Sequence, residues 1–204
     1  MHIGVIGAGQ LGATLAEWCV ESGHDVAVTS RHPERLGGLV GRLGEHGAAM
    51  PVAEAVAYGD AVLFAPDWPS AREVIDLAGD SLTGKVVIDA TNPPEATPDG
   101  MSGLETLMRW APEAHWVKAF NTLPASVLTR RRGHDPLLAE FVCTDLVDAR
   151  LTASKLIREL GFAPVFAGRA DTAKYTETGG PLQLTEVDVA DATEVLAGVL
   201  GDYI

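Results

Sequence analysis

The sequence has little cysteine and few basic side chains. Its two cysteines, Cys19 and Cys143, lie in unlike apolar contexts, which favours core positions over a disulfide framework. Fifteen Lys and Arg residues against 28 Asp and Glu residues give a formal net charge of -13. This balance speaks against nucleic acid or an anionic membrane as a partner, because both require a basic face. Any anion must therefore be bound by a local group of donors.

The sequence also lacks a long apolar run and any internal repeat. No stretch approaches the roughly eighteen residues that are needed to cross a bilayer, so we expect a cytoplasmic protein. The 204 residues suit one well-buried domain with at most a small appendage. We expect residues 1–168 to form an α/β, Rossmann-type doubly wound domain with a mostly parallel sheet. Residues 169–204 would then form a C-terminal helical segment for packing or dimerisation.

A glycine-rich turn, GAGQLG, follows the first apolar run. That run, residues 2–6, predicts a buried parallel strand, and a helical pattern begins directly after the turn. Gly7 allows the tight turn, Gly9 lets the backbone approach a pyrophosphate, and Gly12 lets the helix lie close to the strand. Strand, turn, helix and strand follow in order within about thirty residues, so the sequence predicts nucleotide binding at the positive end of the helix. The cofactor-binding residues expected in the turn are Gly7, Gly9, Gln10, Leu11 and Gly12.

The end of the second predicted strand, residues 25–29, indicates which nucleotide is bound. An acidic residue there would hydrogen-bond the adenosine ribose of NAD, but the sequence continues as Ser30-Arg31. A guanidinium recognises phosphate at two points, so we expect Ser30 and Arg31 to bind the 2′-phosphate of NADP. Arg35 is expected to close the other side, and His32 is a weaker candidate. The alternative is that these are ordinary solvated surface charges.

Later strands end in polar or rigid residues. Ligands of open parallel sheets bind outside the carboxyl ends of the strands, so we expect these residues to line the same site. The alternative for each is that it only forms the turn or loop that follows the strand. The residues expected to line the site in this way are Pro66, Trp68, Asn92, Pro93, Asn121 and Thr122.

The apolar spacing predicts alternating strands and helices along the rest of the chain. Strands are expected at residues 48–50, 60–65, 86–90, 115–120, 139–143 and 163–167. Helices are expected at residues 33–43, 51–56, 68–78, 102–110, 146–160 and 187–201. Arg130-Arg131-Arg132 is interpreted as a solvated basic loop.

The last predicted helix has an apolar face that must be covered. Helices already assigned should cover both faces of the sheet, so we expect this helix to build a homodimer. Packing within a monomer is the alternative.

The stretches GAGQLG, VTSR, APDW, DATNP, VKAFNTLP and ELGFAPVFAG together resemble the coenzyme F-420-dependent NADP oxidoreductases. The likeness covers most of the chain and extends to the cytosolic domain of six-transmembrane ferric reductases. It implies NADP(H) binding by Gly7, Gly9, Gly12, Ser30 and Arg31. The Pro-Trp and Asn-Thr regions would line the place where nicotinamide and deazaflavin meet.

Two departures from the archaeal deazaflavin enzymes bear on the second substrate. Asn121 replaces a histidine, and Asp67 splits the Pro-Trp pair. The NADP-binding residues match independently of these two positions.

The resemblance implies hydride transfer between NADP(H) and a ring-type redox cofactor, which would be coenzyme F-420, FMN or FAD. Such transfer depends on proximity and orientation more than on a side-chain acid. The sequence shows no Ser-Tyr-Lys set and no metal-ligand spacing, so no metal is expected and the catalytic residues remain unassigned. Near the end of the strand expected at residues 115–120, Lys118 and His115 are the only candidate proton donors. His115 begins that strand, far from the site, and Lys118 could face the helix layer.

Three alternative functions compete with hydride transfer to a ring-type cofactor. A hydroxyacid dehydrogenase would need a second helical domain, for which the chain has too few residues. An NADP(H)-binding sensor without turnover and a reductase of a small carbonyl compound both stay open.

Overall fold

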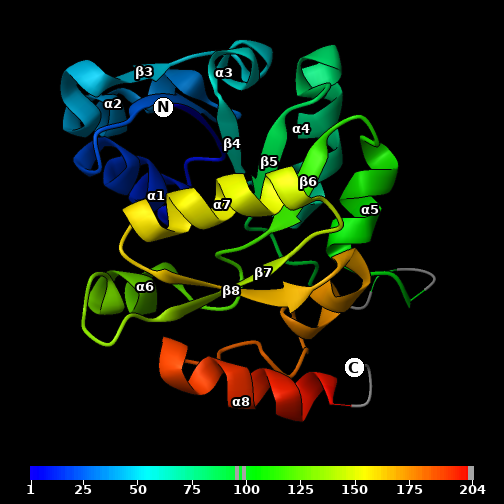
Figure 1. Ribbon diagram of the computed structural model, residues 1–204. Helices are drawn as coiled ribbons and strands as arrows, with labels where there is room; N and C mark the ends of the chain where they lie inside the picture. The colour runs from blue at the N-terminus through cyan, green and yellow to red at the C-terminus, as the bar shows by residue number, and fades with distance from the viewer. Residues whose placement is uncertain (95–96, 98–99, 202–204) are drawn as a thin grey trace. The chain divides into compact units, whose positions relative to one another are not determined.

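The computed structural model describes residues 1–94, 97 and 100–201, and it has the α/β, Rossmann-type architecture that the sequence predicts (Figure 1). Eight strands follow the order β3-β2-β1-β4-β5-β6-β7-β8 in a mostly parallel sheet. The chain divides into two compact units. The first unit is Met1–Thr91 with Leu107–Trp116, and the second unit is Asn92–Thr106 with Val117–Ile204. The domain boundary expected at residue 168 stays a prediction.

The first unit contains five parallel strands with helices between them. Its elements are β1 (His2–Ile6), α1 (Gln10–Glu21), β2 (Asp25–Thr29), α2 (Gly37–Leu43), β3 (Gly47–Ala49), α3 (Val52–Tyr58), β4 (Ala61–Phe64), α4 (Ala71–Ala78) and β5 (Val86–Asp89). The register places Ile6 beside both Thr29 and Phe64. The carboxyl ends of β1, β2 and β4 are therefore level, and the loops that follow them begin at the same edge.

Two predicted helices begin later than the apolar spacing suggests. Residues 33–43 form a short 3-10 turn, Pro33–Arg35, followed by α2, and residues 68–78 form the turn Trp68–Ser70 followed by α4. Each turn carries a proline in its first two positions, where a missing N–H donor does no harm.

The boundary between the units crosses two elements, α5 (Gly103–Trp110) and β6 (His115–Lys118). The sequence predicts a strand as far as residue 120, but Phe120 has a φ of 59°. This left-handed conformation is incompatible with a strand, so β6 ends earlier.

The second unit contains α6 (Ala125–Arg131), β7 (Ala139–Cys143), α7 (Val147–Glu159), β8 (Ala163–Gly168) and α8 (Val189–Leu200). β7 and β8 are parallel neighbours joined through α7, as expected, whereas β6 and β7 are antiparallel. Helices α7 and α8 both contact β8 (Figure 1). The last helix therefore packs on the sheet, although the other helices were expected to cover both of its faces, and the homodimer stays a prediction.

The three consecutive arginines do not form a solvated loop. Arg130 and Arg131 end α6, and both form ion pairs with Glu186. Arg131 also pairs with Asp188, while Arg132 donates to the Leu160 carbonyl. The prediction failed because the acidic partners lie more than fifty positions later in the sequence.

Both cysteines lie in the core, as their apolar contexts predict. Cys19 and Cys143 are free and buried, and burial raises the pKa of the Cys143 thiol to about 12. Across residues 1–94, 97 and 100–201, no helix has both the length and the apolarity that a membrane span requires.

Candidate functional site: a nucleotide pocket

The glycines of the turn meet two kinds of demand. Gly7 has a φ of 91°, and a Cβ there would lie 2.4 Å from the Ala65 carbonyl oxygen. A Cβ at Gly12 would lie 1.8 Å from the Gly7 carbonyl oxygen. Both positions therefore require glycine for the fold itself. A Cβ at Gly9 would meet no described atom within 4 Å, so the space beside this backbone is open.

The N-terminus of α1 is suited to an anion. Gly9 is the N-cap, no side chain of the described residues caps the helix, and the first turn carries no acidic residue. The helix dipole and the amides of the first turn favour negative charge at this point. Together with the open space at Gly9, this is the cradle that a pyrophosphate needs.

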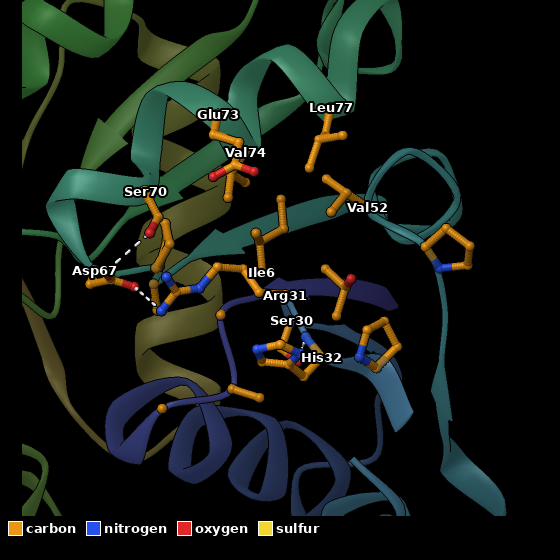
Figure 2. Close-up of a pocket in the computed structure, with 18 of the residues that line it drawn as sticks. Ile6, Ser30, Arg31, His32, Val52, Asp67, Ser70, Glu73, Val74 and Leu77 are labelled. Carbon is orange, nitrogen blue, oxygen red and sulfur yellow. Dashed lines mark hydrogen bonds and ion pairs between the residues drawn. The ribbon is translucent and has the colours of Figure 1, made fainter. Parts of the chain in front are cut away.

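A cavity of about 750 Å³ opens beside the turn, entirely within the first unit (Figure 2). Its volume falls within the usual range for sites that bind cofactors. Five residues predicted as cofactor-binding line this cavity, namely Gly7, Gly9, Ser30, Arg31 and Pro66. The weaker candidate His32 lines it too.

The apolar wall of the cavity was not predicted. Pro51, Val52 and Ala53 line it from the start of α3, and Val74 and Leu77 line it from α4 (Figure 2). Leu77 is 58% exposed, which is unusual for a large apolar side chain on a helix that otherwise buries its apolar face. Val74 and Leu77 are three residues apart, so the sequence indicates that both lie on one face of the helix. That spacing does not show whether the face lines a cavity or packs in the core.

Ser30 and Arg31 follow β2 directly and lie at the cavity, as the sequence predicts. The Ser30 hydroxyl accepts a hydrogen bond from the backbone N–H of His32 at 3.1 Å. Arg31 Nη2 lies 3.3 Å from Asp67 Oδ1, and the Arg31 side chain is 59% exposed. The guanidinium therefore lies at the cavity within reach of solvent.

Several predicted residues of the first unit lie outside the lining. Gln10, Leu11 and Gly12 belong to the first turn of α1. Arg35 is 74% exposed beside Glu34, and Trp68 packs against Trp110 with ring centroids 5.8 Å apart. Their binding roles stay predictions.

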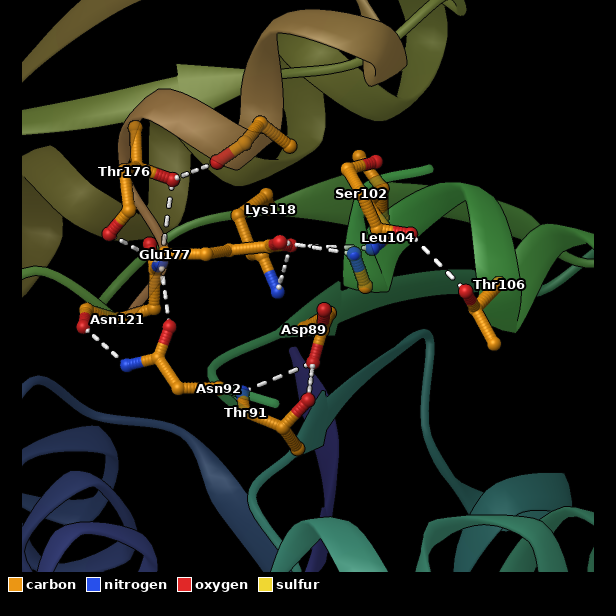
Figure 3. A network of polar contacts seen from close by, with 12 residues as sticks. Asp89, Thr91, Asn92, Ser102, Leu104, Thr106, Lys118, Asn121, Thr176 and Glu177 are labelled. Atoms are coloured by element: carbon orange, nitrogen blue, oxygen red, sulfur yellow. Dashed lines mark hydrogen bonds and ion pairs between the residues drawn. The ribbon is translucent and has the colours of Figure 1, made fainter. Parts of the chain in front are cut away.

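The other predicted residues gather in the second unit (Figure 3). Asn92 Nδ2 donates to the Asn121 carbonyl at 2.7 Å, and Asn121 Nδ2 donates to Asn92 Oδ1 at 3.1 Å. Asn121 Nδ2 also donates to the Thr176 carbonyl at 2.9 Å. Thr122 is buried next to this pair, and Pro93 is buried near Gly103.

Lys118, a candidate proton donor, does not lie at the surface. Its side chain is fully buried, and Nζ lies 2.9 Å from Glu177 Oε1 (Figure 3). The same carboxylate accepts the backbone N–H groups of Gly103 and Leu104 at 2.8 and 3.1 Å, so it caps α5. The structure therefore places Lys118 in a buried ion pair.

Three buried side-chain oxygens at predicted positions or in the lining have no hydrogen-bond partner among the described residues. They are Thr29 Oγ1 in the first unit, and Asn121 Oδ1 and Thr122 Oγ1 in the second. Buried polar atoms are nearly always paired, so each of these is available to a ligand group or a water. Within residues 1–94, 97 and 100–201, no group of three or more His, Cys, Asp or Glu side chains is arranged to hold a metal ion.

One family model matches the N-terminal part of the chain. Residues 2–93 match the family described as NADP oxidoreductase, coenzyme F420-dependent. Metalloreductase STEAP3 of Rattus norvegicus is 31% identical over 179 residues, which cover 86% of this chain and 35% of that protein. The chain thus spans about a third of the length of the curated relatives that it matches.

Two solved structures resemble the chain over nearly its whole length. A hypothetical protein from Sinorhizobium meliloti has a TM-score of 0.82 at 28% identity, covering 92% of this chain and 95% of that one. A candidate F420-dependent NADP reductase from Arthrobacter sp. FB24 has a TM-score of 0.75 at 27% identity, covering 98% and 94%.

Proposed function

We propose that this chain, whose residues 2–93 match the model of the coenzyme F420-dependent NADP oxidoreductases, is an enzyme that transfers a hydride between NADP(H) and a ring-type redox cofactor. The proposal rests on one observation: a single cavity is lined both by the backbone of Gly9, which has open space beside it, and by the exposed side chain of Arg31. The first feature suits a pyrophosphate, and the second suits a 2′-phosphate.

Each part of the cavity has a role in this proposal. The turn at Gly9 and the N-terminus of α1 would hold the pyrophosphate, and Ser30 with Arg31 would hold the 2′-phosphate. The apolar wall that Val52 and Leu77 form would flank the adenine. The Thr29 hydroxyl, buried and unpaired among the described residues, would bond a polar group of the cofactor. When bound, NADPH supplies the hydride, while the residues of the chain bind and orient it.

The acceptor is proposed as a deazaflavin such as coenzyme F-420, with FMN and FAD as further candidates. The family description and the Arthrobacter neighbour support the first of these. A ferric chelate is the fourth candidate, because a metalloreductase is among the relatives. We propose no catalytic acid, since transfer between two rings needs orientation first.

The activity is tested by following NADPH oxidation by absorbance. Deazaflavin, FMN, FAD and ferric citrate are offered side by side at equal concentration, and we expect turnover with the deazaflavin or a flavin. An NADP(H)-binding sensor would bind NADPH and turn over none of the four. Turnover of a small carbonyl compound instead would favour the second alternative.

The cofactor assignment is tested with Arg31→Ala. Loss of a charge-assisted phosphate contact costs about 1.5–3 kcal/mol, so NADPH binding should weaken roughly ten- to a hundredfold while NADH binding is spared. Titration of the fluorescence of each cofactor measures both. Arg42→Ala is the matched control, because Arg42 pairs with Glu17 and does not line the cavity. An equal loss for NADPH and NADH would refute the assignment.

We also propose that the protein forms a homodimer. Large apolar side chains are exposed on α7, β8 and α8, among them Leu151 at 59%, Phe166 at 45% and Val189 at 43%. Such surface is commonly covered by a second copy in a symmetric dimer. Light scattering of the full chain at micromolar concentration should give twice the chain mass of 21.4 kDa. A monodisperse monomer would exclude the dimer.

A further inference from the structure

Asp67 is one of the two residues that depart from the family pattern, and it lies against Arg31, the residue expected to bind the 2′-phosphate. Its Oδ1 is 3.3 Å from Arg31 Nη2, and its Oδ2 accepts a hydrogen bond from the Ser70 hydroxyl at 3.0 Å (Figure 2). All three residues line the cavity. Asp67 thus lies in the cavity that is proposed to bind the nucleotide, as well as bearing on the second substrate.

A carboxylate and a phosphate compete for the same donors of a guanidinium, because both accept its planar N–H groups. The Arg31 side chain is 59% exposed and that of Asp67 is 56% exposed. Pairs as exposed as this are weak and open readily. Arg31 can therefore exchange Asp67 for a phosphate without leaving a buried charge unpaired.

The exchange has a cost that depends on the cofactor. Ser70 holds the Asp67 carboxylate in place, so a 2′-phosphate on Arg31 would lie close to a second negative charge. A ribose 2′-hydroxyl brings no charge and leaves the Arg31–Asp67 pair intact. The carboxylate thus disfavours the phosphorylated cofactor selectively.

We propose that Asp67 is a specificity-determining residue, which competes with the 2′-phosphate for Arg31 and so reduces the preference for NADP(H) over NAD(H). This inference rests on the proposed function, since it assumes that the cavity binds a dinucleotide. According to this inference, the Asp67 side chain sets the ratio of the affinities for NADP(H) and NAD(H).

The test is Asp67→Asn, which removes the charge and keeps an oxygen that can accept from Ser70. NADPH and NADH are titrated by fluorescence, and 2′,5′-ADP and 5′-AMP are titrated by calorimetry as probes of the adenosine half. We expect the variant to bind NADPH and 2′,5′-ADP about three- to tenfold more tightly and to bind NADH and 5′-AMP within about twofold of wild type. The gain should shrink as salt is raised, because the repulsion is between exposed charges.

Two controls separate competition for Arg31 from other effects. Asp76→Asn makes the same charge change at a residue paired with Arg72 outside the lining, and it should leave both cofactors unchanged. In the Arg31→Ala background, Asp67→Asn should lose most of its gain for NADPH. Asp67→Ser also removes the charge, and it should reproduce the change in ratio if the asparagine variant folds poorly.

The outcomes distinguish this inference from the proposed function. An unchanged NADPH to NADH ratio in the asparagine variant overturns the role of Asp67, and so does a gain that persists in full without Arg31. Wild-type protein that binds 2′,5′-ADP but transfers no electrons refutes the proposed activity and leaves the Asp67 result valid. Wild-type protein that binds none of the four ligands overturns both.

Discussion

The cavity of the first unit and the polar network of the second unit use the same kinds of side chain in opposite ways. In the cavity, Arg31 and Asp67 are paired but more than half exposed. In the network, Lys118 is fully buried and Glu177 is 5% exposed at the side chain. The two pairs have similar separations between charged atoms, 3.3 and 2.9 Å, so distance alone does not distinguish them.

Burial determines what each pair can do. An exposed pair loses little when a ligand displaces one partner, because water solvates the other. A buried pair cannot be opened cheaply, because each charge would then be left without a partner in a medium that solvates it poorly. The first arrangement suits binding and the second suits structural rigidity.

Lys118→Met should have the largest effect on stability. It leaves the Glu177 carboxylate buried without its cation, which typically costs about 3–5 kcal/mol in the free energy of unfolding. Urea unfolding measures the loss. Arg42→Met, which breaks an exposed pair with Glu17, should cost less than about 1 kcal/mol. Equal losses in the two variants would remove the distinction drawn between buried and exposed pairs.

Gly9→Val should abolish cofactor binding in a folded protein. The position has a φ of -68° and open space for a side chain, so the fold tolerates valine, but the branched side chain fills the space for the pyrophosphate. We expect NADPH affinity to fall at least about a hundredfold, or about 2.7 kcal/mol. Circular dichroism and a binding titration measure the two effects.

Gly12→Val provides the comparison for that variant. Its Cβ would collide with the Gly7 carbonyl, so thermal stability itself should fall. A folded Gly9→Val variant that binds NADPH normally would mean that the turn is structural only.

Glu140 in β7 should make the stability of the folded protein depend on pH. The side chain is fully buried and accepts one hydrogen bond from the Phe120 N–H at 3.2 Å. Burial raises its pKa from 4.5 to about 8, and the hydrogen bond from Phe120 offsets this in part. The folded protein therefore holds a proton that the unfolded chain releases between these pH values. The free energy of unfolding should fall by up to about 1.4 kcal/mol per pH unit as pH rises from 4.5 to 8.

Glu140→Gln should remove this slope, because the amide does not titrate. Thermal unfolding at pH 5, 6, 7 and 8 compares the variant with wild type, and Glu159→Gln, at an exposed pair with Lys155, serves as the control. Parallel pH curves for wild type and Glu140→Gln would show that Glu140 is not protonated in the folded protein.

Local pattern was enough to predict most of the elements. The predicted strand over residues 139–143 has the bounds of β7, and the helix predicted over residues 146–160 differs from α7 by one residue at each end. Apolar runs and alternating signals are local, so each can be read without knowledge of its neighbours. The arginines at the end of α6 were misread because their acidic partners come from distant positions.

The sequence by itself determined the glycine turn, the absence of an acid after β2 and the charge of Ser30-Arg31, because these depend on residue types at adjacent positions. Only the tertiary structure decided that Lys118 is buried against Glu177 and that Asp67 meets Arg31. The partners in these pairs are 59 and 36 positions apart, and no local pattern specifies which side chains such separations bring together. The apolar wall of the cavity was also decided only by the tertiary structure. Core residues and cavity residues of a helix follow the same helical spacing in the sequence and differ only in what packs against them.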